Sequence, residues 1–171
     1  MAERAQVRLS AVAGYTVLRV KSWLPHIIAG GLPVTLSGAE MPSRVGEVRA
    51  GSTRALCIGP AEWLLVSREN AADLRQQLEP DAATFGLSLL ELTDALSVLE
   101  LGGPTAPEVL ARGCGLDLHP ERFAAGHCTR TRLAQLPVVI DCVDPLPRYT
   151  LFVARSYRVW LTDWLADASQ D

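Results

Sequence analysis

Short apolar runs alternate with turn residues along this chain, and helical periodicity follows them at three places. The first such unit has an apolar run at 55–58, a turn at 59–62 and a second apolar run at 63–67. A helix at 70–80 follows them. Asn70 is a suitable helix N-cap, and Leu74 and Leu78 fall on one helical face. We expect Pro80 to end this helix, because proline has no amide hydrogen to donate.

The same order of elements occurs twice more. In the second unit we expect a hairpin of strands 87–92 and 96–101 around Thr93-Asp94, then a helix from Thr105 to Arg112 ended by Gly113. In the third unit we expect strands at 130–141 and 149–154 around a turn at 144–147, then a helix at 156–167. An earlier strand is expected at 15–20, before the Gly- and Pro-rich stretch 25–52, which can hold only short strand or helix pieces.

Three strand-strand-helix units without βαβ alternation predict an α+β fold. Its ferredoxin-like elements would form an antiparallel or mixed sheet with helices on one side. Residues 1–171 are long enough for one packed core, so we expect a single domain. Residues 1–14 are expected to form an N-terminal arm, and residues 168–171 a disordered tail.

The last helix has the clearest periodicity. Apolar side chains recur at i, i+3, i+4, i+7, i+8 and i+11, at Tyr157, Trp160, Leu161, Trp164, Leu165 and Ala168. We favour the interpretation that Trp160 and Trp164 cover the sheet as core residues. The alternative is that part of this stripe docks a partner subunit, because tryptophan is enriched at protein interfaces.

Composition excludes several classes of function. A formal net charge of -3 gives no electrostatic support for binding nucleic acid. No run of about 18 apolar residues predicts a membrane span, and the N-terminus lacks a signal-peptide pattern, so we expect a soluble, cytoplasmic protein. The four cysteines are too few and too scattered for a disulfide scaffold and should be thiols.

Catalytic motifs are missing from the sequence. It contains no phosphate-binding loop, no dinucleotide-binding glycine motif and no nucleophile elbow. Cys114, His119, His127 and Cys128 match no zinc-site spacing, and Lys21 is the only lysine that could form a Schiff base. We therefore expect no catalytic residue, metal site or cofactor site on this chain.

Three arginines are candidates for a partner interface. Arg130 and Arg132 share a strand face through their two-residue spacing. Arg155 precedes the last helix, where a cation gains nothing from the helix dipole. Arginine is favoured at interfaces because its planar fork binds carboxylates in bidentate fashion. An internal salt bridge between strand and helix would explain these residues equally well.

Five separated strings add a resemblance to a known family. They are ALCIGPAEWLL at 55–65, LTDALSVLELGGPTAPEVLA at 92–111, GCGLDLHPERF at 113–123, CTRTRLA at 128–134 and FVARSY at 152–157. In order and spacing, the chain resembles the gamma subunit of heterotetrameric sarcosine oxidase over about residues 50–168. More distantly, the strings resemble the folate-binding domain of the glycine-cleavage aminomethyltransferase, whose members are about twice as long.

The resemblance implies a role by assembly. Enzymes of this family oxidatively demethylate sarcosine to glycine, with FAD, FMN, NAD and tetrahydrofolate on the alpha and beta subunits and zinc on the delta subunit. The gamma chain would then be a non-catalytic partner of the alpha, beta and delta subunits. Two alternatives remain: a stand-alone folate-binding or aminomethyltransferase-like protein, and the small subunit of a related N-methyl amino-acid dehydrogenase. A folate-binding iron-sulfur maturation protein would carry a Lys-Gly-Cys-Tyr-type motif, whereas residues 125–129 read AGHCT.

Overall fold

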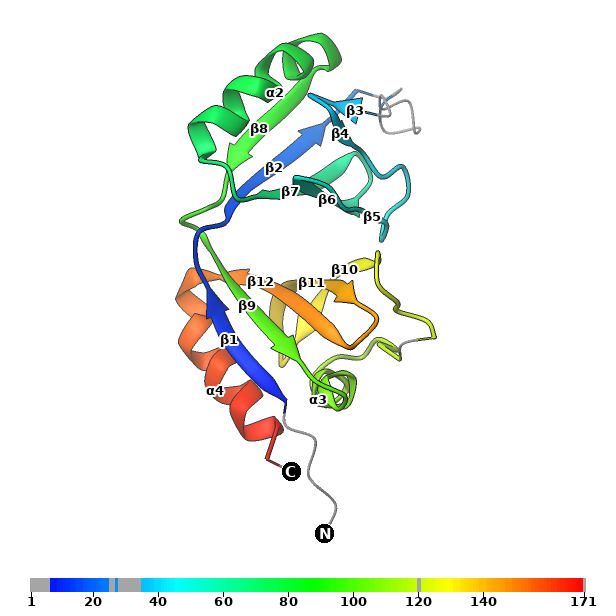
Figure 1. The fold of residues 1–171 in the computed structure, drawn as a ribbon, viewed down its shortest axis with the longest axis vertical. Coiled ribbons are helices and arrows are strands. Elements are labelled where there is room, and N and C mark those ends of the chain that lie inside the picture. The colour runs from blue at the N-terminus through cyan, green and yellow to red at the C-terminus, as the bar shows by residue number, and fades with distance from the viewer. Residues whose placement is uncertain (1–6, 25–26, 28–34, 120, 171) are drawn as a thin grey trace. The chain divides into compact units, whose positions relative to one another are not determined.

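The computed structural model describes residues 7–24, 27, 35–119 and 121–170. These residues form two compact units, one of residues up to Ala13 together with Leu96 onward, the other of Gly14–Ala95. Each unit contains one five-stranded antiparallel sheet (Figure 1). The fold is therefore α+β, but the expectation of a single sheet is wrong.

The sheet of the first unit has the strand order β1-β9-β12-β11-β10. Its strands are β1 (Arg8–Val12), β9 (Leu96–Gly102), β12 (Arg148–Ala154), β11 (Leu136–Asp144) and β10 (Cys128–Leu133). Helices α3 (Ala106–Ala111) and α4 (Arg158–Ala168), the latter preceded by the 3-10 turn η1 (Arg155–Tyr157), accompany it. Both helices share one core with the sheet, through residues such as Leu110 and Leu161 against Leu99 and Ile140.

The sheet of the second unit has the order β5-β6-β7-β2-β8. Its strands are β5 (Val48–Arg49), β6 (Thr53–Gly59), β7 (Glu62–Ser67), β2 (Thr16–Ser22) and β8 (Leu87–Glu91). Helix α2 (Ala71–Phe85) places Leu74 and Leu78 in one core with Leu18, Val20 and Leu65 of the sheet. A separate two-stranded ladder joins β3 (Thr35–Leu36) to β4 (Ala39–Glu40).

Part of the segment expected to be an arm, residues 8–12, is the edge strand β1, which pairs with β9. Residues 1–6 lie outside the described residues, as do 25–26 and 28–34 of the Gly- and Pro-rich stretch. The described part of that stretch holds the short strands β3, β4 and β5. At the other end, Ala168 is buried as the last residue of α4, and Asp171 is not described.

The expected hairpin of residues 87–101 is wrong in its pairing. Strand β8 pairs with β2 in the second unit, whereas β9 pairs with β1 and β12 in the first. Both strands exist where the apolar pattern predicts them, but their partners are distant in sequence. The turn at Thr93-Asp94 therefore lies where the chain passes from one unit to the other.

The single strand expected at 130–141 is instead the hairpin of β10 and β11. The two turn residues, Ala134 and Gln135, both have positive φ, at 48° and 70°. Such a pair is typical of the two-residue turns that match the twist of antiparallel strands. Asn-Gly or Asp-Gly usually marks this turn; Ala134-Gln135 carries no such signal, so the sequence pattern predicts one continuous strand.

Helix α2 starts as expected but does not end at Pro80. The side chain of Asn70 accepts a hydrogen bond from the amide of Asp73, and the helix continues to Phe85. Gly86 then adopts the left-handed conformation at φ 59°, and its amide donates to the carbonyl of Ala82. Ala82 is buried together with Leu74 and Leu78, so packing on the sheet offsets the hydrogen bond that Pro80 cannot make.

Candidate functional site

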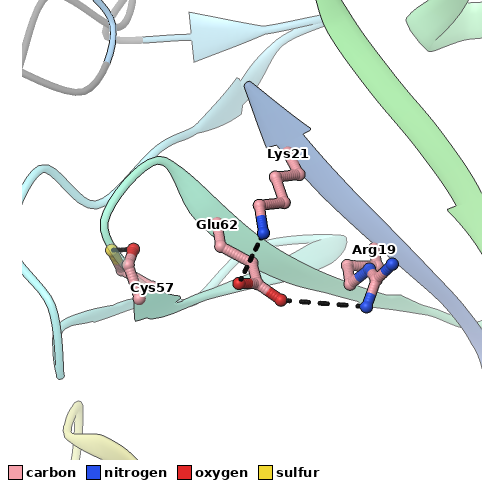
Figure 2. A network of polar contacts seen from close by, with 5 residues as sticks. Arg19, Lys21, Cys57 and Glu62 are labelled. Carbon is pink, nitrogen blue, oxygen red and sulfur yellow. Dashed lines mark hydrogen bonds and ion pairs between the residues drawn. The ribbon is translucent and has the colours of Figure 1, made fainter. Parts of the chain in front are cut away.

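A buried acid with two cations is the main polar cluster of the second sheet. Glu62, at the start of β7, has only 7% of its surface exposed. Its Oε1 lies 3.9 Å from Nη1 of Arg19, and its Oε2 lies 3.7 Å from Nζ of Lys21 (Figure 2). Lys21 is directly opposite Glu62 in the β2–β7 ladder, so the three side chains share one sheet face. This arrangement offsets the desolvation of Glu62 and ties β2 to β7.

Lys21 has a second contact that supports a structural role. Its Nζ lies 5.3 Å from the centre of the Trp23 ring, within cation–π range. The only lysine of the chain is thus held between a carboxylate and an aromatic ring. The sequence contains a signal for this cluster, because Arg19 and Lys21 interrupt an apolar strand at two-residue spacing. The residues predicted above as functional do not include Arg19, Lys21 or Glu62.

Cys57, also labelled in Figure 2, lies opposite Trp63 at the irregularity between β6 and β7, and its side chain belongs to the core of the second unit. Burial raises the pKa of its thiol; contact with the backbone of Gly59 acts in the opposite direction, and the Glu47 carboxylate adds to the rise. Its Sγ lies 3.5 Å from the carbonyl oxygen of Gly59. A protonated, covered thiol is a poor nucleophile, because the thiolate is the reactive form.

We expect Cys57 to react with iodoacetamide at pH 8 at least about tenfold more slowly in the folded chain than in urea. Mass spectrometry of the modified peptides would measure this. A Ser156→Cys variant supplies a matched exposed thiol, since Ser156 lies on the surface, and it should react in both states. Equal labelling of Cys57 with and without urea would contradict the burial.

The arginines expected at an interface lie in the first unit. Arg130 and Arg132 are both exposed on β10, an edge strand of the sheet. Arg155 is exposed in η1, directly after β12. Because β10 and β12 flank β11 and run parallel to each other, Arg132 and Arg155 come from the same end of the sheet. Arg130 and Arg155 each also make a contact within the chain.

The buried residues of α4 confirm the predicted helical periodicity, but the predicted burial of Trp160 is wrong. Leu161 and Leu165 are fully buried, and Trp164 packs against the same core. Trp160, expected in the core, is 50% exposed, because only part of the apolar stripe touches the sheet. With about 100° per residue, Trp160 lies about 120° from the midline between Leu161 and Leu165, beyond the face they bury.

The sulfur and imidazole groups considered as metal ligands have other neighbours. The Sγ of Cys114 lies 3.8 Å from the Thr131 hydroxyl, and Nδ1 of His127 lies 3.1 Å from the carbonyl oxygen of Ala124. In the parts of the chain that the structure describes, no group of three His, Cys, Asp or Glu side chains could hold a metal ion. Of the helices described, none combines the length and apolar character needed to cross a membrane.

Comparison with known proteins identifies the family. The sequence profile described as "Sarcosine oxidase, gamma subunit family" matches residues 28–171. This chain belongs to the sarcosine oxidase gamma subunit family. The gamma subunit of Corynebacterium sp. strain U-96 sarcosine oxidase is 32% identical over 171 residues, which cover 99% of this chain and 82% of the relative. The resemblance of the five sequence strings is therefore confirmed.

Solved structures agree with this family assignment. One such structure is the heterotetrameric sarcosine oxidase from Corynebacterium sp. U-96 in complex with pyrrole 2-carboxylate. One of its chains superposes on this gamma-family chain with a TM-score of 0.84 and 31% identity. The superposition covers 99% of this chain and 86% of that chain. Aminomethyltransferase T of the Bartonella henselae glycine cleavage system superposes with a TM-score of 0.69 at 17% identity. The superposition covers 95% of this chain and 46% of the aminomethyltransferase. The second match shows the aminomethyltransferase fold alone.

Proposed function

We propose that this chain is a non-catalytic gamma subunit that supports assembly of a heterotetrameric sarcosine oxidase, which oxidatively demethylates sarcosine to glycine. The observation that carries the proposal is the match of nearly the whole chain to one chain of such an assembled enzyme. The partners are then the alpha, beta and delta subunits in the cytoplasm. FAD, FMN, NAD and tetrahydrofolate belong to those subunits, and none is assigned to this chain.

The chemistry of the described residues supports a structural role. Glu62, a buried acid, has a cation near each carboxylate oxygen. Lys21 is engaged by an ion pair and an aromatic ring, and all four cysteines are buried. Glu62 and Lys21 thus interact with each other within one sheet, and the four thiols are buried.

Co-expression with the large subunits tests the proposal. We expect a tagged alpha subunit to retain this chain in stoichiometric amount and the complex to oxidise sarcosine, whereas the purified full chain alone neither oxidises sarcosine nor binds tetrahydrofolate. Calorimetry would measure folate binding. Saturable binding of tetrahydrofolate by the chain alone, with no retention by the alpha subunit, would favour a stand-alone folate-binding protein.

The exposed arginines Arg130, Arg132 and Arg155 are the proposed contacts of this subunit with its partners. Arg132→Glu is the single change to test first. We expect it to lower co-purification with the large flavin subunit by at least about tenfold while the chain stays folded, because charge reversal replaces attraction by repulsion. Arg130→Glu with Arg132→Glu should lower it further. Quantitative gel analysis of the retained complex measures both.

Two control variants separate an interface role from a general charge effect. Arg132→Lys keeps the charge and should retain more complex than Arg132→Glu. Arg75→Glu reverses an exposed arginine on α2, which pairs with Glu79 within its own helix, and should leave the yield unchanged. Wild-type yield for Arg132→Glu, together with a wild-type melting curve, would reject the arginine interface.

A further inference from the structure

Strand β10 ends the sheet of the first unit (Figure 1), and its ladder partner is β11. The outer side of an edge strand presents main-chain N–H and C=O groups, to which an extended segment of another chain can add a strand. Opposite residues of an antiparallel pair alternate between hydrogen-bonded and non-hydrogen-bonded positions. The phase of the β10–β11 ladder therefore decides which residues of β10 direct their main-chain groups outward.

A hydrogen bond at one end of the ladder fixes this phase. The amide of Cys142 donates to the carbonyl of His127 at 2.9 Å, so these two residues form a hydrogen-bonded pair. Every second pair of the register is then hydrogen-bonded, and Arg132 with Pro137 falls between two such pairs. Proline suits this position, because no hydrogen bond to β10 is required of it there. The main-chain N–H and C=O of Arg132 thus point away from β11, toward the outer side of the sheet.

The side chain of Arg132 limits the kind of segment that can pair with β10. Arg132 is exposed and shares a sheet face with Arg130, which makes another contact within the chain. The residue directly opposite Arg132 in an added strand has its Cβ about 5 Å away, within reach of an ion pair. Strand β10 carries no acidic residue, so it attracts a segment with an acid at that position. Two copies of β10 paired antiparallel about their centre would place arginine opposite arginine, which is destabilising.

We propose that β10 receives an extended segment of another subunit of the same complex as an added strand, with an acidic side chain of that segment opposite Arg132. This inference rests on the proposed function as an assembly subunit and specifies how the arginine contact is made. Main-chain hydrogen bonds give the added strand its affinity, and the ion pair with Arg132 fixes its register.

Two variants at one position separate the main chain from the side chain. Arg132→Ala removes the guanidinium, and Arg132→Pro removes it together with the outward amide hydrogen. Proline is tolerated where the N–H of an edge strand faces outward, so both variants should melt like folded chains. Surface plasmon resonance measures binding of each full chain to an immobilised complex of the remaining subunits. We expect Arg132→Pro to bind at least about tenfold more weakly than Arg132→Ala, because a partner carbonyl then loses its donor.

Hydrogen exchange tests the same contact without a variant. The amide of Arg132 points outward, whereas Thr131 belongs to a hydrogen-bonded pair with Val138. We expect assembly with the remaining subunits to slow exchange of the Arg132 amide by at least about tenfold and to change that of Thr131 much less. Mass spectrometry with fragmentation to single residues measures both amides in the chain alone and in the complex.

The outcomes distinguish this inference from the proposed function. Failure of the wild-type chain to bind the remaining subunits would overturn the proposed function and the added strand with it. Equal affinities of folded Arg132→Pro and Arg132→Ala, beside normal wild-type assembly, would overturn the added strand alone. If Arg132→Pro does not fold, unchanged exchange of the Arg132 amide on assembly overturns it instead. Self-association of the wild-type chain with protection of that amide would assign the edge to a second copy and overturn the inference.

Discussion

Replacing Trp164 by alanine is expected to lower the free energy of unfolding by about 3 kcal/mol, whereas Trp160→Ala should lower it by less than about 1 kcal/mol. Both residues belong to one apolar stripe of α4, but only Trp164 packs against the core of the first unit. Half of Trp160 is exposed, so its removal leaves no internal cavity. Urea unfolding of the full chain, followed by circular dichroism, measures both changes.

Gly113 provides an independent check on how Trp164 is packed. A Cβ at Gly113 would lie 2.5 Å from Cη2 of Trp164 and 3.0 Å from the amide nitrogen of Ala134. Gly113→Ala should therefore destabilise the chain by about 1 to 3 kcal/mol, as overpacking does, and by less when Trp164 is already alanine. Equal losses for Trp160→Ala and Trp164→Ala would contradict the packing of α4.

At high pH, stability is expected to fall between pH 10 and 12 because of Tyr149. This residue is 1% exposed and stacks on Phe123, with ring centres 6.3 Å apart. Burial raises the pKa of Tyr149 to about 12, and the charge of Cys142, its cross-strand neighbour, contributes to the rise. An unfolded tyrosine has a pKa near 10, so below that pH both states hold the proton and stability is complete.

Above pH 10 the unfolded chain releases this proton while the folded chain retains it. Tyr149 should then cost about 1.4 kcal/mol of stability per pH unit up to its folded pKa. Urea unfolding at pH 9, 10 and 11 measures the slope, and Tyr149→Phe should remove this contribution. Tyr157→Phe is the matched control, because Tyr157 is 44% exposed. Parallel stability curves for wild type and Tyr149→Phe up to pH 11 would contradict the effect.

The local elements of the fold could be predicted where short-range physics dominates. The hairpin of β6 and β7 and the side-chain cap at Asn70 lie where apolar runs and turn residues place them. The helical period of α4 is equally clear, since Leu161 and Leu165 recur on its buried face. For the candidate surfaces, the two-residue spacing of Arg130 and Arg132 put both on one side of a strand, and both are exposed there.

Other features depend on contacts between distant residues. Strand β8 follows the same local pattern whether it pairs with β9 or with β2, and only the assembled sheets select β2. The β10–β11 turn requires left-handed backbone at Ala134 and Gln135, two residues that do not favour it by themselves. The buried Glu62 cluster likewise forms because β2 and β7 pair in one register.

The sequence by itself determined the family, the α+β class and the positions of most strands and helices, because these follow from local patterns and from separated strings in a constant order. Only the tertiary structure decided that the strands form two sheets, that α2 continues past Pro80, and that Trp160 is half exposed while Trp164 packs against the core. The physical reason is that periodicity specifies which side chains share a helix face. How much of that face is buried depends on the width of the surface that packs against it, and residues far away in the chain supply that surface.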